Sequence, residues 1–232
     1  MKTKIQTIIY LAVILLFISC TRKSPEHSAE LNRIANIFPD YNGVTIPINI
    51  APLNFIVREK ATSFMVCISG NNGKKIYIAS NDGNIQIPLK KWQELIKANS
   101  GSDYNIDIYA KLDGKWNHFN TITNHIAPDA IDEYLMYRFI NPANILWDRM
   151  GIYQRNLSNF DVNPIMDNSL TDNNCMHCHT VAANNAGNFM LHMRGKPGGT
   201  VIYSDNKLKF VDTKTPQTIA PGGYPSWHPS GK

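Results

Sequence analysis

The stretch between Asn54 and Thr123 most constrains the fold, because it alternates short β-type runs with turn signals. The runs are rich in branched and aromatic residues, and Gly73, Gly83 and Gly114 each follow Asn or Asp in the turns between them. Residues 87–99 differ, since they place apolar side chains at helical spacing after a proline. The pattern therefore predicts a small β-sandwich over residues 54–124 with one inserted helix.

The apolar pattern changes in residues 125–199, where we expect helices. In residues 129–140 several side chains recur at helical spacing, Pro142 interrupts the pattern, and residues 143–157 resume it. The side chains on the first predicted helical face are Ile131, Tyr134, Leu135 and Arg138. Beyond Gly195 two strand-like runs follow, and the turn-like Asp205-Asn206 joins them.

The N-terminus has the pattern of a secretory signal. Lys2 and Lys4 precede an apolar run from Ile8 to Ile18, which is too short to serve as a permanent membrane span. Because Cys20 closes this run, the segment resembles a bacterial lipoprotein signal, in which the cysteine becomes the acylated first residue. A plain secretory signal cleaved nearby is the alternative. The net charge of +5 falls when Lys2 and Lys4 are removed, and no basic stripe indicates a nucleic-acid partner.

Two cysteines and a histidine form the motif Cys175-Met176-His177-Cys178-His179. The Cys-x-x-Cys-His pattern is typical of covalent haem c attachment, since two thiols must reach one edge of the porphyrin while the adjacent imidazole rises under the iron. We therefore expect haem c, with Cys175 and Cys178 as thioether anchors and His179 as the proximal iron ligand. The expected distal ligand is His192, and the alternatives are Met190, Met193 or an open position.

Two other chemistries compete for the same cysteines. A zinc site would use Cys175 and Cys178 with His179 and His192, although such sites usually contain a second Cys-x-x-Cys pair. A thioredoxin-like dithiol would need the motif at the start of a helix that follows a strand. Cys67 lies in an apolar strand-like run, where a buried free thiol is expected.

The last residues, 224–232, read YPSWHPSGK and resemble the turn of TolB-type β-propeller repeats. With "GIYQRNL", "CMHCH" and "RGKPGGT", they make the chain similar to a family of exported lipoproteins that combine an N-terminal β-domain, a Cys-x-x-Cys-His motif and a TolB-like propeller. Some members carry cytochrome c biogenesis names. A propeller needs about four blades to close, so the resemblance implies that residues 200–232 begin a propeller that this chain does not complete.

These patterns together predict an α+β protein: a small N-terminal β-sandwich, a helical haem-motif segment and the first strands of an incomplete β-propeller. The expected segments are a signal peptide (1–19), a lipidated cysteine with its tether (20–53), the β-sandwich (54–124), the haem segment (125–199) and the propeller start (200–232). We expect an outer-membrane or periplasmic-facing lipoprotein that transfers single electrons to a redox partner and is not an enzyme. The alternative is a non-catalytic lipoprotein that binds glycans or partner proteins.

Overall fold

The computed structural model describes residues 23–140, 150–176, 178–196 and 198–231. They form two compact units. The N-terminal unit comprises the described residues up to Ile48 together with Pro52–Ala130. The C-terminal unit comprises Asn49–Ala51 and the described residues from Ile131 onward.

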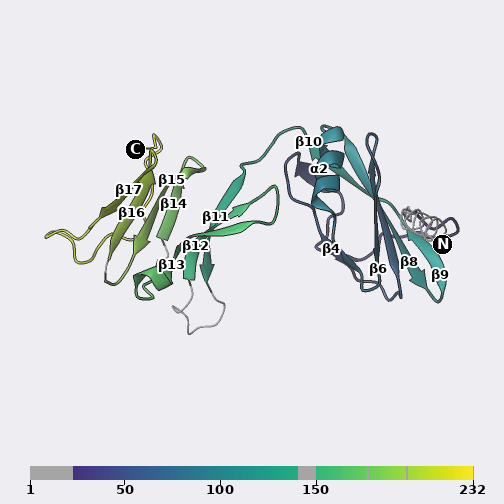
Figure 1. Cartoon of the computed structure of the whole chain (residues 1–232), viewed down its shortest axis with the longest axis horizontal. Coiled ribbons are helices and arrows are strands. Elements are labelled where there is room, and N and C mark those ends of the chain that lie inside the picture. Colours follow the sequence, from purple (N-terminus) through teal and green to yellow (C-terminus); the bar gives the residue numbers. More distant parts are fainter. Residues whose placement is uncertain (1–22, 141–149, 177, 197, 232) are drawn as a thin grey trace, which may run out of the picture. The chain divides into compact units, whose positions relative to one another are not determined.

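The main sheet of the N-terminal unit is built around strand β8, which is labelled in Figure 1. On one side β8 pairs with β5, which pairs with β6, and on the other it pairs with β9 and β10. Strands β1 and β3 add parallel to β9 and β10. The strands are β1 (Ala29–Leu31), β3 (Thr45–Pro47), β5 (Phe64–Gly70), β6 (Ile76–Ser80), β8 (Asp103–Leu112), β9 (Lys115–Phe119) and β10 (Ile122–Ala127).

Turn chemistry and alternation explain these strands. Asp113 and Gly114, which join β8 to β9, both have positive φ (48° and 79°), the type I′ geometry that two-residue hairpins favour. Along β8 the even-numbered side chains from Tyr104 to Ala110 are buried, whereas the odd-numbered ones are partly or fully exposed. One face of the sheet is therefore part of the core, and the other carries polar groups.

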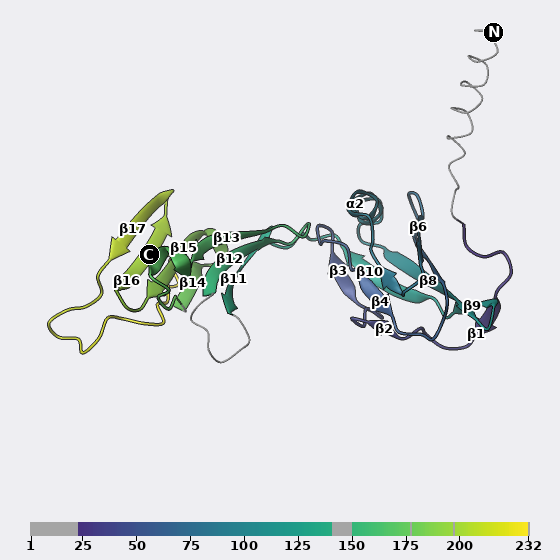
Figure 2. The ribbon, with the colours of Figure 1, turned by 60° about the horizontal axis from the view of Figure 1, so that its bottom comes forward.

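A second, three-stranded sheet completes the unit with β2 (Ile37–Phe38), β4 (Phe55–Val57) and β7 (Asn84–Ile85). Its buried residues, among them Phe55 and Ile85, belong to the same unit's core. Figure 2 looks along helix α2 (Leu89–Ala98), whose buried side chains are Trp92, Leu95 and Ile96. The Trp92 ring meets the Tyr104 ring of β8 edge-on, with centroids 5.6 Å apart.

The C-terminal unit contains two antiparallel meanders. The first is β11 (Tyr134–Ile140), β12 (Met150–Asn156) and β13 (Val162–Asp167), after which comes the short 3-10 helix η1 (Asn168–Thr171). The second is β14 (Cys178–Ala182), β15 (Asn185–Met193), β16 (Gly199–Ser204) and β17 (Lys207–Val211). One buried cluster joins the meanders, since Met150 and Ile152 of β12 pack with Leu191 and Met193 of β15.

The predicted α+β class with a helical haem-motif segment is wrong, because the described residues are mostly β and contain one α-helix, α2. The first predicted helix is instead β11, paired with β12 from Tyr134 to Ile140. Six of the seven β11 residues are apolar or aromatic, so helical spacing arises without a helix. Of the second predicted helix, residues 143–149 lie outside the described residues and the following part is β12.

The residues expected to begin a propeller form β16 and β17, the last two strands of the second meander. Asp205 and Asn206, which connect them, have φ of 52° and 57°, and the strands pair from Ser204↔Lys207 outward. This is again type I′ geometry. In the following C-terminal segment, the indole Nε1–H of Trp227 donates a hydrogen bond to the backbone carbonyl of Thr180 in β14, at 3.3 Å.

Candidate functional site

The cysteines expected to anchor haem are part of a packed β-structure. Cys175 belongs to the buried cluster of the C-terminal unit, and Cys178 is the first residue of β14. Both are buried thiols without a disulfide. His177 lies outside the described residues.

Strand geometry separates the side chains that one haem would need together. Successive residues of a strand point to opposite faces of the sheet, so Cys178 and His179 face opposite ways. His192 pairs in register with Cys178, whereas His179 pairs with Leu191, and directly paired residues share a face. The expected proximal and distal histidines therefore lie on opposite faces of one sheet and cannot ligate the same iron.

The side chains of the other expected haem ligands take part in packing and hydrogen bonding within the C-terminal unit. His192 is 2% exposed, and its Nδ1 lies 3.0 Å from the Thr200 hydroxyl. Burial, and secondarily the charge of Arg194, lower the pKa of His192 below its usual 6.5. Met193 packs in the buried cluster, and Met190 is half-buried opposite Thr180. The methionines thus behave as ordinary packing residues of β15.

The predictions of haem c and of haem-based electron transfer are therefore wrong. In the described part of the chain no three His, Cys, Asp or Glu side chains come together in a way that could hold a metal ion, which also argues against the zinc alternative. The thioredoxin-like alternative fails because Cys178 opens a strand rather than a helix. Cys67 is the buried free thiol that its apolar run predicted.

The expected lipidation site, Cys20, lies outside the described residues, and its acylation stays a prediction. Among the residues that the structure describes, no helix combines the length and the apolar character needed to cross a membrane.

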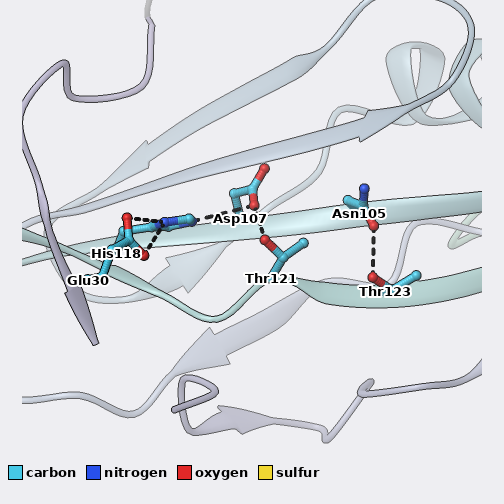
Figure 3. A network of polar contacts seen from close by, with 6 residues as sticks. All are labelled: Glu30, Asn105, Asp107, His118, Thr121 and Thr123. Atoms are coloured by element: carbon cyan, nitrogen blue, oxygen red, sulfur yellow. Dashed lines mark hydrogen bonds and ion pairs between the residues drawn. The ribbon is translucent and has the colours of Figure 1, made fainter. Parts of the chain in front are cut away.

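A polar network covers part of the outer face of the N-terminal unit's main sheet (Figure 3). The Thr121 hydroxyl donates to Asp107 Oδ1 at 2.6 Å, and the Thr123 hydroxyl donates to Asn105 Oδ1 at 2.9 Å. His118 lies between two carboxylates, with Nδ1 3.0 Å from Glu30 Oε2 and Nε2 3.5 Å from Asp107 Oδ1. The His118 ring also stacks on Tyr109, with centroids 4.4 Å apart.

This network is best explained as sheet stabilisation. In a nucleophilic triad the imidazole accepts the proton of the nucleophile, but here the Thr121 proton goes directly to a carboxylate and both ring nitrogens of His118 face carboxylates. Cross-strand pairs of this kind each contribute up to about 1 kcal/mol to a sheet. The outer face is therefore not our candidate site.

A cleft of about 600 Å³ in the C-terminal unit is a better candidate. We call it the aromatic cleft, after Tyr134, Phe189 and Tyr203 in its lining. It opens where the β14–β15 turn comes close to the first meander, and strands β11, β12, β13, β15 and β16 all contribute to it. Its lining residues are Asp132, Glu133, Tyr134, Gln154, Ile165, Ala183, Asn184, Asn185, Ala186, Gly187, Phe189 and Tyr203.

The aromatic cleft is lined by both aromatic and polar side chains. Phe189 and Tyr203 are cross-strand partners whose ring centroids lie 5.4 Å apart, and Tyr134 is 38% exposed. The lining includes two carboxylates and two kinds of amide side chain, but no lysine or arginine. The cleft therefore has aromatic walls, and the charged side chains in its lining are both acidic.

Some polar groups of the cleft are already engaged and others are available. Glu133 Oε1 accepts a hydrogen bond from Asn156 Nδ2 at 3.1 Å, and Asn185 Oδ1 accepts one from the Gly187 backbone N–H at 2.8 Å. Within the described part of the chain, the side chains of Asp132, Gln154 and Asn184 have no hydrogen-bond partner. A ligand can therefore bind to carboxylate and amide groups without first breaking protein contacts.

The turn that forms one rim of the cleft is locally strained. Ala183 and Asn184 both have positive φ, 46° and 61°, although alanine rarely adopts this region. The type I′ hairpin requires this conformation, and asparagine tolerates it better than alanine does. Strained backbone of this kind persists where surrounding structure holds it, which is common at binding sites.

Sequence reasoning missed the aromatic cleft because its residues come from five strands and the segments between them, spread over residues 132–203. The apolar spacing places Tyr134 on a helical face and Gln154 inside a second predicted helix. The Asn184-Asn185 pair was a detectable turn signal, but nothing local indicated which strands would surround it.

No protein-family model matches the chain, and no curated protein is significantly similar to it.

Proposed function

We propose that the chain is an exported binding protein whose aromatic cleft holds a neutral carbohydrate. Sugars combine apolar C–H faces with closely spaced hydroxyl groups. Aromatic rings pack against the C–H faces, whereas carboxylates and amides accept and donate to the hydroxyls. The single observation that carries the proposal is the meeting of Tyr134, Gln154 and Asn184 in one cleft of about 600 Å³.

The charge of the lining indicates which carbohydrates fit. Asp132 and Glu133 contribute negative charge and the lining includes no basic side chain, so a uronic acid or a sulfated sugar would be repelled. A neutral sugar meets no such penalty. The proposed ligand class is therefore neutral oligosaccharides.

The setting of the binding protein rests on two sequence patterns. The signal segment that ends at Cys20 supports export and a lipid anchor. The second pattern is the resemblance of "CMHCH", "RGKPGGT" and "YPSWHPSGK" to exported TolB-like lipoproteins. An anchored carbohydrate-binding protein would hold sugars at the membrane surface.

Calorimetric titration of the intact chain with neutral oligosaccharides tests the proposal. Tyr134→Ala and Gln154→Ala should each weaken binding about tenfold, because each removes a wall or a hydrogen-bonding group of the cleft. Tyr224→Ala is the matched control, since this tyrosine is 81% exposed and lies outside the cleft. Uronic acid oligosaccharides should bind more weakly than neutral ones.

Two results would contradict the proposal. One is the absence of binding to every neutral saccharide tested. The other is equal weakening by Tyr134→Ala and Tyr224→Ala, which would show that binding does not depend on the cleft.

A further inference from the structure

Four lysines from two separate segments line one cavity of the N-terminal unit. Lys74 and Lys75 lie in the loop between β5 and β6, and Lys90 and Lys91 lie near the start of α2. The cavity has a volume of about 480 Å³. Its remaining lining residues are Gly73, Ile76, Glu94 and Leu95. We call this feature the lysine pocket.

The lysine pocket carries excess positive charge. The only carboxylate in its lining is Glu94, and none of the four ammonium groups takes part in an ion pair or side-chain hydrogen bond within the described residues. Four like charges around one concave surface repel one another, and low-dielectric walls strengthen their field. All four lysines are solvent-exposed, and what distinguishes them from other surface lysines is that they line the same cavity.

Two further features suit the pocket to a ligand. Ile76 and Leu95 are each only 1% exposed, so the inner wall of the pocket is apolar, whereas the four lysines themselves are exposed to solvent. The two lysine-bearing segments are also held together by Asn99, which is itself 1% exposed. The lysines are therefore brought to the pocket by buried structure rather than by chance encounters of mobile loops.

Hydrogen bonds of the Asn99 side chain connect the two lysine-bearing segments. The backbone N–H of Asn72 donates to Asn99 Oδ1 at 2.8 Å, and Asn99 Nδ2 donates to the carbonyls of Asn72 and Leu95 at 2.9 and 2.8 Å. Asn72 precedes Lys74 by two residues, and Leu95 lies one helical turn beyond Lys91. Gly70 makes the approach possible, since a Cβ there would lie 2.4 Å from the Asn99 side chain.

We propose that the lysine pocket binds a phosphate-bearing ligand. Several ammonium groups that converge without counter-charges match a compact, multiply charged anion, and lysine binds phosphate as a point charge. The phosphate could belong to a soluble molecule or to a lipid headgroup, and both present the same group to the pocket. This site is independent of the aromatic cleft, which lies in the other unit and is lined by opposite charge.

Calorimetric titration of the intact chain with tripolyphosphate, at low and at physiological salt, tests the proposal. The double variant Lys74→Gln/Lys90→Gln should bind about tenfold more weakly than the wild type, because one ammonium group is lost from each segment. The matched control is Lys207→Gln/Lys209→Gln, which removes the same charge from the exposed strand β17 of the other unit. The control should bind like the wild type.

Sedimentation with vesicles separates the two sources of phosphate. Retention on vesicles that contain phosphatidylglycerol, lost in Lys74→Gln/Lys90→Gln, supports a lipid headgroup, whereas tripolyphosphate binding without vesicle retention supports a soluble ligand. Failure of the wild type to bind either probe at low salt overturns the proposal. Equal weakening in the two double variants also overturns it, because binding would then follow net charge rather than the pocket.

Discussion

Replacement of Asn99 by alanine should lower the free energy of unfolding of the N-terminal unit by more than the loss of so small a side chain suggests. The side chain makes three hydrogen bonds, to the backbone N–H and C=O of Asn72 and to the C=O of Leu95. A net contribution of about 1 kcal/mol for each bond gives a loss of about 2–3 kcal/mol. The exposed Asn72 groups can be rehydrated, which places the expected loss at the lower end of that range.

Asn99→Asp should be worse than Asn99→Ala at neutral pH. Aspartate keeps the acceptor for the Asn72 N–H but loses both donors, and it places a carboxylate against two carbonyl oxygens. A buried charge without a partner is costly, so the additional loss should be at least about 1 kcal/mol. Protonation of the new carboxylate restores one donor, so the difference between the two variants should shrink in acid.

Urea denaturation followed by tryptophan fluorescence measures these losses. Trp92 is fully buried on α2 and reports on the N-terminal unit, and the slope of the transition should not change. Asn117→Ala is the control, since Asn117 makes one local hydrogen bond, to the Lys115 carbonyl at 2.9 Å. The reasoning is refuted if Asn99→Ala costs less than about 1 kcal/mol, or if Asn99→Asp is the milder change at neutral pH.

Two further predictions concern pH. The hydrogen bond from Arg33, aided by the Asn36 backbone N–H, lowers the pKa of Glu59 below 4.5, so its contribution is complete above that pH and is lost as pH falls through the lowered value. Glu59→Gln should therefore destabilise the N-terminal unit by about 1 kcal/mol at pH 7 and by less in acid, as urea midpoints at several pH values would show; a pH-independent difference would contradict this. Because burial lowers the pKa of His192, protons bind preferentially to the unfolded chain below pH 6.5, and acid should destabilise the C-terminal unit. His192→Gln should reduce this loss of stability in acid, as measured by urea midpoints at several pH values. An unchanged dependence of the midpoint on pH would contradict the prediction.

The sequence determined the elements whose signals are local. The helix predicted in residues 87–99 is α2, because its three buried residues recur at helical spacing after Pro88. The Asp113-Gly114 and Asp205-Asn206 turns have the backbone conformation that their residue types favour. Along β8, apolar residues alternate with polar ones, and this local pattern matches the buried and exposed faces of the strand. Each of these features depends on neighbours within about ten residues.

Only the tertiary structure decided how distant segments meet. Residues 134–140 match a helical spacing, but pairing with β12 makes them a strand. Cys178 and His179 are adjacent in a motif typical of haem attachment, yet the pairing of β14 with β15 directs them to opposite faces. The two lysine pairs of the lysine pocket are fifteen residues apart and come together through Asn99. Strand pairing and side-chain convergence depend on the burial of surface from the whole unit, and no local pattern encodes them.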